Sequence, residues 1–164
     1  LADVSVSRYV KFSNFFSREA VRAAPSTPSK SVEEFVAAAL EMYGRNCSTL
    51  YAGLQPQDGA IRMAHLAPKA WVISGGSQDE LRRIFSEKGI DSHFVSIRGS
   101  PRKKPDHLRE ILAQEGLDSS EILFIGDGWT DFKTCAELGA SFCFLRCFSD
   151  WAAADEQIAA DPRK

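Results

Sequence analysis

The stretch "LFIGDGWTDF", residues 123–132, places an apolar strand directly before a glycine and two aspartates. Burial makes an ionised carboxylate costly unless a cation or strong hydrogen bonds stabilise its charge. Asp127 and Asp131 therefore require a partner, which is either a metal ion or the first turn of the next helix. This stretch alone leaves both explanations open, although helix capping accounts for one aspartate better than for two.

The composition is that of an ordinary soluble globular protein. The chain has 164 residues, of which 44% are hydrophobic and 26% charged, with a formal net charge of -2 at pH 7. This charge gives no general attraction for nucleic acid or for an anionic membrane surface. No apolar run approaches the roughly 18 to 20 residues that span a bilayer, and the first residues lack the order of a signal peptide. We expect a cytoplasmic protein without a nucleic-acid or membrane partner.

The four cysteines show neither a CxxC pair nor zinc-like spacing with histidine; they are Cys47, Cys135, Cys143 and Cys147. Free cysteine packs as a small hydrophobic residue, so we expect reduced, buried thiols. Metal binding by Cys143 and Cys147 is the alternative.

Residues 1–52 are predicted to be a helical region. An apolar face over residues 4–22 indicates one helix, and Ser31 with Glu34 forms a capping box that opens a second, ending before Gly44.

Residues 53–164 alternate between strand and helix patterns. Ser77 with Glu80 is expected to cap one of the helices, and Gly116 and Gly139 to end two others. The predicted strands cover 70–74, 93–97, 121–126 and 141–146, and the helices 58–66, 77–88, 105–115 and 130–138. This alternation predicts an α/β fold, with a parallel sheet flanked by helices.

Polar residues follow the predicted strands where parallel sheets bind ligands, at the carboxyl ends. Ser74, Gly75 and Gly76 offer a hydroxyl and unhindered backbone N–H groups for an anion, although plain strand-to-helix punctuation is the alternative. Lys104 precedes the proline that starts a helix, so its ammonium group can reach a phosphate. A solvated basic turn is the alternative for this lysine.

These three pieces, in this order, resemble the haloacid dehalogenase-like superfamily of phosphatases. The matching segments are "WVISGG" with Ser74, "GSPRKKPDHL" with Lys104, and "LFIGDGWTD" with Asp127 and Asp131. The resemblance extends from about residue 53 to residue 145. It implies a Rossmann-like fold and a Mg²⁺-dependent phosphatase acting on a small phosphorylated metabolite.

The resemblance also implies the roles of the site residues. Phosphate would be held by Ser74, Gly75, Gly76 and Lys104, and the metal by Asp127 and Asp131. Ser74, Lys104 and Asp127 would serve catalysis. The segment "VSRYVKFSNFF" is similar to part of the helical cap in a phosphoglycolate-phosphatase-like branch. By this analogy Arg8, Tyr9 and Lys11 would close over the site and select the substrate.

The sequence departs from this family in one respect. The family's first motif is a strand ending in DxDxT or DxDxV, which supplies the nucleophilic aspartate, and these 164 residues contain no such segment. We therefore expect a truncated, catalytically incomplete form whose upstream segment is missing. In the family that strand lies in the middle of the sheet, so its loss would leave exposed edges that favour a homodimer, a rearranged sheet or marginal stability.

Two other functions remain open from the sequence. One is a non-catalytic binding or assembly module of the same fold. The other is a different Rossmann-like, nucleotide-dependent enzyme.

Overall fold

The computed structural model describes residues 8–23 and 31–162, which fall into two compact units. The first unit comprises the described parts of residues 1–72 together with 76–101, and the second comprises 73–75 and 102–164. These units do not test the predicted boundary between residues 52 and 53. Among the described helices, none has both the length and the apolar character needed to cross a bilayer.

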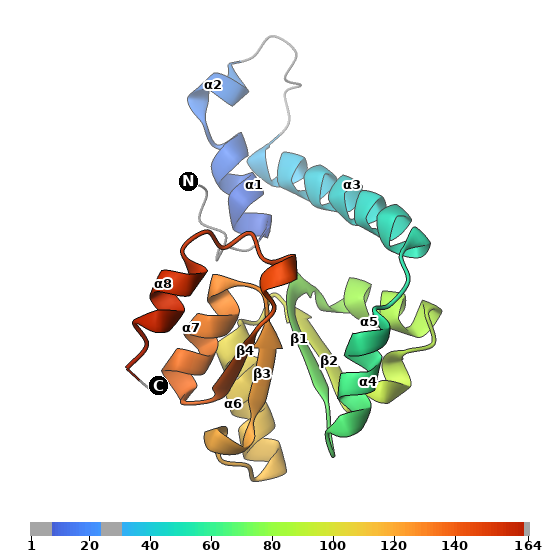
Figure 1. The fold of residues 1–164 in the computed structure, drawn as a ribbon. Coiled ribbons are helices and arrows are strands. Elements are labelled where there is room, and N and C mark those ends of the chain that lie inside the picture. The colour runs from blue at the N-terminus through green and yellow to red at the C-terminus, as the bar shows by residue number, and fades with distance from the viewer. Residues whose placement is uncertain (1–7, 24–30, 163–164) are drawn as a thin grey trace. The chain divides into compact units, whose positions relative to one another are not determined.

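The first unit begins with three helices, α1 (Arg8–Phe16), α2 (Glu19–Arg22) and α3 (Val32–Gly53). Aromatic rings join α1 to α3, because Phe16 stacks on Phe35 at 5.2 Å and Phe12 meets Tyr43 at 6.2 Å between ring centroids (Figure 1). The single helix predicted over residues 4–22 is therefore two helices, and its residues 4–7 lie outside the described part of the chain.

The start of α3 was predicted correctly and its end was not. Ser31 accepts a hydrogen bond from the Glu34 N–H at 3.2 Å, and the Glu34 carboxylate accepts one from the Ser31 N–H at 2.7 Å. The helix then continues through Gly44, where it was predicted to end, to Gly53. One interior glycine costs only about 1 kcal/mol relative to alanine, which is too little to end a helix that packs against α1.

The rest of the first unit contains α4 (Asp58–Leu66), β1 (Trp71–Ser77), α5 (Gln78–Glu87) and β2 (Ser96–Ser100). The strand predicted at 70–74 continues to Ser77, and the strand predicted at 93–97 starts at Ser96, after a 3-10 turn over Asp91–His93. The predicted cap by Ser77 is wrong, since its side chain makes no capping hydrogen bond.

The second unit contains α6 (Lys104–Glu115), β3 (Leu123–Gly126), α7 (Trp129–Leu138), β4 (Ser141–Phe144) and α8 (Ala154–Ala159). Strands β3 and β4 run parallel and side by side, with Leu123 opposite Ser141 (Figure 1). Gly116 and Gly139 end α6 and α7 in the left-handed conformation, at φ of 66° and 77°, as predicted. The predicted α/β class is confirmed.

The core of the second unit lies between its helices and strands. Leu108 on α6, Cys135 on α7 and Ala140 are buried together, and Ile73, Phe124 and Phe142 pack against them. All four cysteines are free thiols. Only Cys135 is buried, so the predicted burial is wrong for the exposed Cys147 and incomplete for Cys47 and Cys143.

The predicted single sheet is observed as two pairs of strands. Within residues 8–23 and 31–162, β1 pairs with β2 and β3 pairs with β4, and no hydrogen-bonded ladder joins the two pairs. A missing middle strand would leave such a division, and this explanation stays a prediction.

Candidate functional site

The turn between β3 and α7 is built around the carboxylate of Asp131. Gly128 precedes the helix, and its N–H donates a hydrogen bond to Asp131 Oδ2 at 3.2 Å. The Asp131 N–H in turn donates to the Gly128 carbonyl oxygen at 3.0 Å. Asp131 therefore caps the first turn of α7, where an anionic side chain is also favoured by the helix dipole.

Gly126 leaves room for this buried carboxylate. A Cβ atom at position 126 would lie 2.6 Å from Asp131 Cγ and 2.7 Å from its Oδ2. The approach is too close for any side chain, so the glycine before Asp127 is needed to seat Asp131.

Lys104 supplies the cation that a buried aspartate requires. Its ammonium group forms an ion pair with Asp131 Oδ1, and the two side chains are only 18% and 5% exposed. Lys104 is the first residue of α6 and Asp131 lies in the first turn of α7, so two helix N-termini present this pair. The structure thus brings together two residues that lie 27 positions apart in the sequence.

Asp127 differs from Asp131 in being exposed. Within the described part of the chain, its carboxylate makes no hydrogen bond or ion pair. Asp127 is therefore available to bind a ligand, whereas both oxygens of Asp131 already have protein partners. The predicted metal-binding role of Asp131 stays a prediction.

The donor set fits a hard cation that takes few protein ligands. No group of three or more histidine, cysteine, aspartate or glutamate side chains is placed to hold a metal among the described residues. Mg²⁺ is usually held by one or two carboxylates, with waters and substrate phosphate completing its shell. Asp127, backed by Asp131, matches that requirement and does not match a tetrahedral zinc site.

Ser74 and the two glycines lie within β1 and not in the predicted turn, because the strand continues to Ser77. Ser74 is half-buried, and a Cβ atom at Gly75 would have no protein atom within 4 Å. Ile73 packs against the cluster that contains Leu108, which lies one helical turn beyond Lys104. The close approach of Ser74 itself to Lys104 stays a prediction.

The residues predicted to assist the site are mostly engaged with other groups. Arg102 pairs with Glu110, and Arg98 Nε donates to Ser96 Oγ at 3.0 Å. Arg8 lies 4.3 Å over the ring centroid of Tyr43 and 3.4 Å from Glu80. Tyr9 and Lys11 are exposed, and the predicted part of these cap residues in substrate selection stays a prediction.

Trp129 and Trp151 pack within the second unit, as expected. Their ring centroids lie 5.3 Å apart, and Trp151 also contacts Phe132 and Phe144, at 5.4 Å and 5.7 Å.

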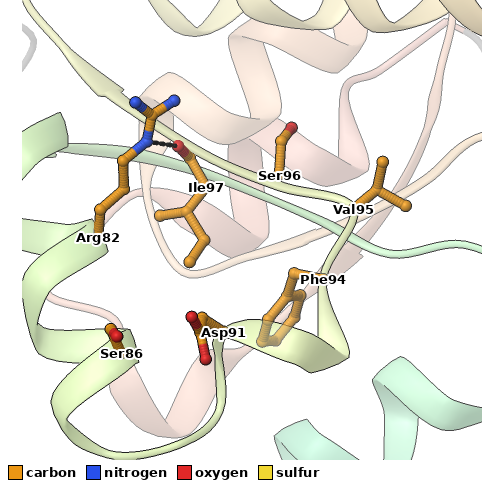
Figure 2. Close-up of a pocket in the computed structure, with 7 residues that line it drawn as sticks. All are labelled: Arg82, Ser86, Asp91, Phe94, Val95, Ser96 and Ile97. Atoms are coloured by element: carbon orange, nitrogen blue, oxygen red, sulfur yellow. Dashed lines mark hydrogen bonds between the residues drawn. The ribbon is translucent and has the colours of Figure 1, made fainter.

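Two features of the first unit were not anticipated from the sequence. A Cβ atom at Gly99 would lie 2.6 Å from the Gly76 carbonyl oxygen, so this glycine allows β2 to approach the end of β1. A shallow pocket of about 450 Å³ lies beside β2. Figure 2 shows it lined by Arg82, whose Nε donates to the Ile97 carbonyl oxygen at 3.0 Å, and by Asp91 and Phe94. None of the predicted site residues lines this pocket.

Comparison with protein families gives a match to the haloacid dehalogenase-like hydrolases over residues 59–139. This segment includes Ser74, Lys104, Asp127 and Asp131. A comparison with curated protein sequences gives no match.

Three solved structures share the fold. A HAD-superfamily hydrolase, subfamily IA, variant 1, from Geobacter sulfurreducens has a TM-score of 0.55 and 22% identity over 85% of this chain. A haloacid dehalogenase-like family hydrolase from Streptococcus pneumoniae has a TM-score of 0.57 and 17% identity over 85%. A hydrolase from Streptococcus pneumoniae TIGR4 has a TM-score of 0.52 and 14% identity over 93%. The present chain spans 63%, 68% and 88% of these proteins, respectively.

Proposed function

We propose, from the membership of residues 59–139 in the haloacid dehalogenase-like hydrolase family, that this chain forms the phosphate- and metal-binding part of a magnesium-dependent phosphomonoesterase. Its substrate would be a small phosphorylated metabolite, and its location the cytoplasm. No nucleic acid or membrane is needed for this activity.

The observation that carries the proposal is the arrangement of three charged groups at two helix N-termini. Lys104 is held by the buried Asp131, while Asp127, four positions before Asp131, is exposed and has no ion-pair partner in the described chain. Asp127 would hold Mg²⁺, with Asp131 behind it orienting Lys104. Lys104 and the Ser74 hydroxyl would bind the phosphate oxygens, with the Gly75 and Gly76 N–H groups beside them. A bound Mg²⁺ would neutralise charge on the transferring phosphoryl group.

The 164 residues contain no DxDxT or DxDxV segment, so we propose that this chain alone does not turn over phosphate esters. Loss of a covalent nucleophile usually removes several powers of ten in rate, although charge stabilisation can leave residual activity. The same observation favours a second candidate, a non-catalytic binding module that retains the cation and phosphate sites.

Calorimetric titration with Mg²⁺ in the presence of inorganic phosphate tests the proposed binding site. We expect Asp127→Asn to weaken Mg²⁺ binding at least about tenfold, because it removes the charged oxygen ligand. Asp150→Asn is the matched control, since Asp150 is also exposed in the second unit. Equal Mg²⁺ affinity in the two variants would refute the metal assignment.

Hydrolysis of p-nitrophenyl phosphate separates the enzyme from the binding module. We expect this chain with Mg²⁺ to give the same rate as Asp127→Asn. A metal-dependent rate that Asp127→Asn abolishes would show that the chain is catalytically complete. Tight binding of ATP with Mg²⁺, without binding of inorganic phosphate, would instead indicate a nucleotide-dependent enzyme.

A further inference from the structure

Strand β3 has one edge that is paired and one that is open. The Ser141 N–H donates to the Ile122 carbonyl oxygen at 3.0 Å, and the Leu145 N–H donates to the Gly126 carbonyl oxygen at 2.8 Å. In a parallel ladder the backbone groups of alternate residues face the same neighbour. Even-numbered residues of β3 therefore face β4, and the N–H and C=O groups of Leu123, Ile125 and Asp127 face the other way.

Nothing among the described residues pairs with this second edge. The backbones of Leu123, Ile125 and Asp127 make no hydrogen bond there, and β3 belongs to a sheet of only two strands. The Leu123 side chain is 59% exposed. Proteins usually protect such an edge with lysine, proline or a bulge, and "LFIGD" contains neither lysine nor proline. An unprotected edge of this kind is a template for another strand.

We propose that a second copy of this chain pairs with the open edge of β3 in an antiparallel manner, about a two-fold axis at Ile125. Each Ile125 then lies opposite its counterpart, and each Leu123 lies opposite Asp127 of the other copy. All three outward-facing residues exchange both backbone hydrogen bonds in this register. The inference is independent of the proposed enzymatic function.

The edge itself favours a second copy in this orientation. A two-fold axis uses the same edge on both copies, so the contact closes and leaves no further edge of β3 exposed. Leu123 and Ile125 lie on one face of the strand and gain apolar neighbours across the new pair. A parallel arrangement would place the two Asp127 carboxylates side by side, whereas the antiparallel one places them at opposite ends of the paired strands.

Hydrogen exchange combined with sedimentation velocity tests the pairing in the unmodified chain. We expect a dimer that forms as the protein concentration rises. With it, the amides of Leu123, Ile125 and Asp127 should become protected. The amides of Phe124 and Gly126 face β4 and should be protected at every concentration. A chain that stays monomeric at all concentrations overturns the proposal, as does a dimer in which the three outward-facing amides still exchange freely.

Leu123→Pro tests the same contact by mutation. Proline removes an N–H that points to the open edge, and Leu123 is the first residue of the strand, where proline is tolerated. Ile122, which precedes it, already has the extended conformation that proline requires, at φ of -99° and ψ of 128°. The ladder with β4 should therefore remain intact.

We expect Leu123→Pro to weaken dimerisation at least about tenfold, because the symmetry removes two hydrogen bonds at once. Leu123→Ala is the control, since it shortens the side chain and keeps the N–H, and we expect a smaller effect. If the proline variant does not fold, as judged by circular dichroism, Leu123→Lys places a charge at the same edge and should also favour the monomer. An unchanged dimer in both Leu123→Pro and Leu123→Lys overturns the proposal.

Discussion

At the scale of single residues, Asp131 determines which neighbours the candidate site accepts. Gly126→Ala should lower the free energy of unfolding by about 1–3 kcal/mol, the usual cost of overpacking. The new Cβ would lie 2.6 Å from Asp131 Cγ, and Asp131 cannot move away without losing its bonds to Lys104 and Gly128. Urea denaturation measures the change.

Gly75→Ala is the control for this substitution. A Cβ atom at position 75 would have no protein atom within 4 Å, so its effect should stay within about 0.5 kcal/mol of the unmodified chain. Equal losses in the two variants would show that the contact with Asp131 is not the cause.

The sequence predicted which residues of the second unit meet but not how they divide their roles. The motifs around Lys104 and Asp131 indicated one shared site, and the two side chains form an ion pair. The two aspartates looked equivalent in the sequence because both follow the same strand. Their difference depends on side-chain direction, since Asp131 turns back over Gly126 and Asp127 points to solvent. A linear motif does not encode that choice.

At the scale of elements, the contact between α1 and α3 should depend on pH through Tyr43. A hydrogen bond with the Cys47 side chain, followed by burial, raises the pKa of Tyr43 above its ordinary value of 10.0, against the opposing effect of Arg8. The neutral phenol is therefore favoured in the folded state. Its contribution to stability is complete below pH 10 and is lost as the pH rises through the raised pKa.

Absorbance titration near 295 nm follows this ionisation. Tyr43→Phe should remove the highest tyrosine transition, and Cys47→Ala should lower the pKa of Tyr43 toward 10.0, because the hydrogen bond is the largest cause of the shift. A Tyr43 transition that stays unchanged in Cys47→Ala would contradict this account.

Element ends were predicted where the chain has one strong local signal. Gly116 and Gly139 adopt positive φ and end their helices as expected, because that conformation strains other residues. Gly44 has no positive φ, and packing against α1 carries the helix past it. Strand ends were less predictable: β1 continues through Gly75 and Gly76 because it pairs with β2, a partner that local sequence does not reveal.

At the scale of the whole molecule, the alternation of strands and helices predicted the α/β class and could not predict the division of the strands into two pairs. Alternation records the order of elements along the chain, whereas the number of strands in a sheet depends on contacts distant in sequence. A two-stranded sheet is marginal by itself, so each pair depends on the helices that cover it.

This dependence predicts that the two compact units lose stability separately. Leu108 and Val36 are each 2% exposed, one in the second unit and one in the first. Truncating a buried aliphatic side chain to alanine costs about 2–5 kcal/mol for leucine and somewhat less for valine, because a cavity remains. We expect Leu108→Ala to reduce hydrogen-exchange protection in α6, α7 and β3 while α3 keeps its own, and Val36→Ala to do the reverse.

Each variant thus serves as the control for the other, since both remove apolar atoms from a fully buried helix position. Mass spectrometry of peptides covering residues 31–53 and 104–138 would resolve the two responses. If either substitution lowered protection equally in both sets of peptides, the chain would unfold as one cooperative body. The helices over each strand pair would then not be its principal support, and the open edge of β3 would have to be considered together with the stability of the entire chain.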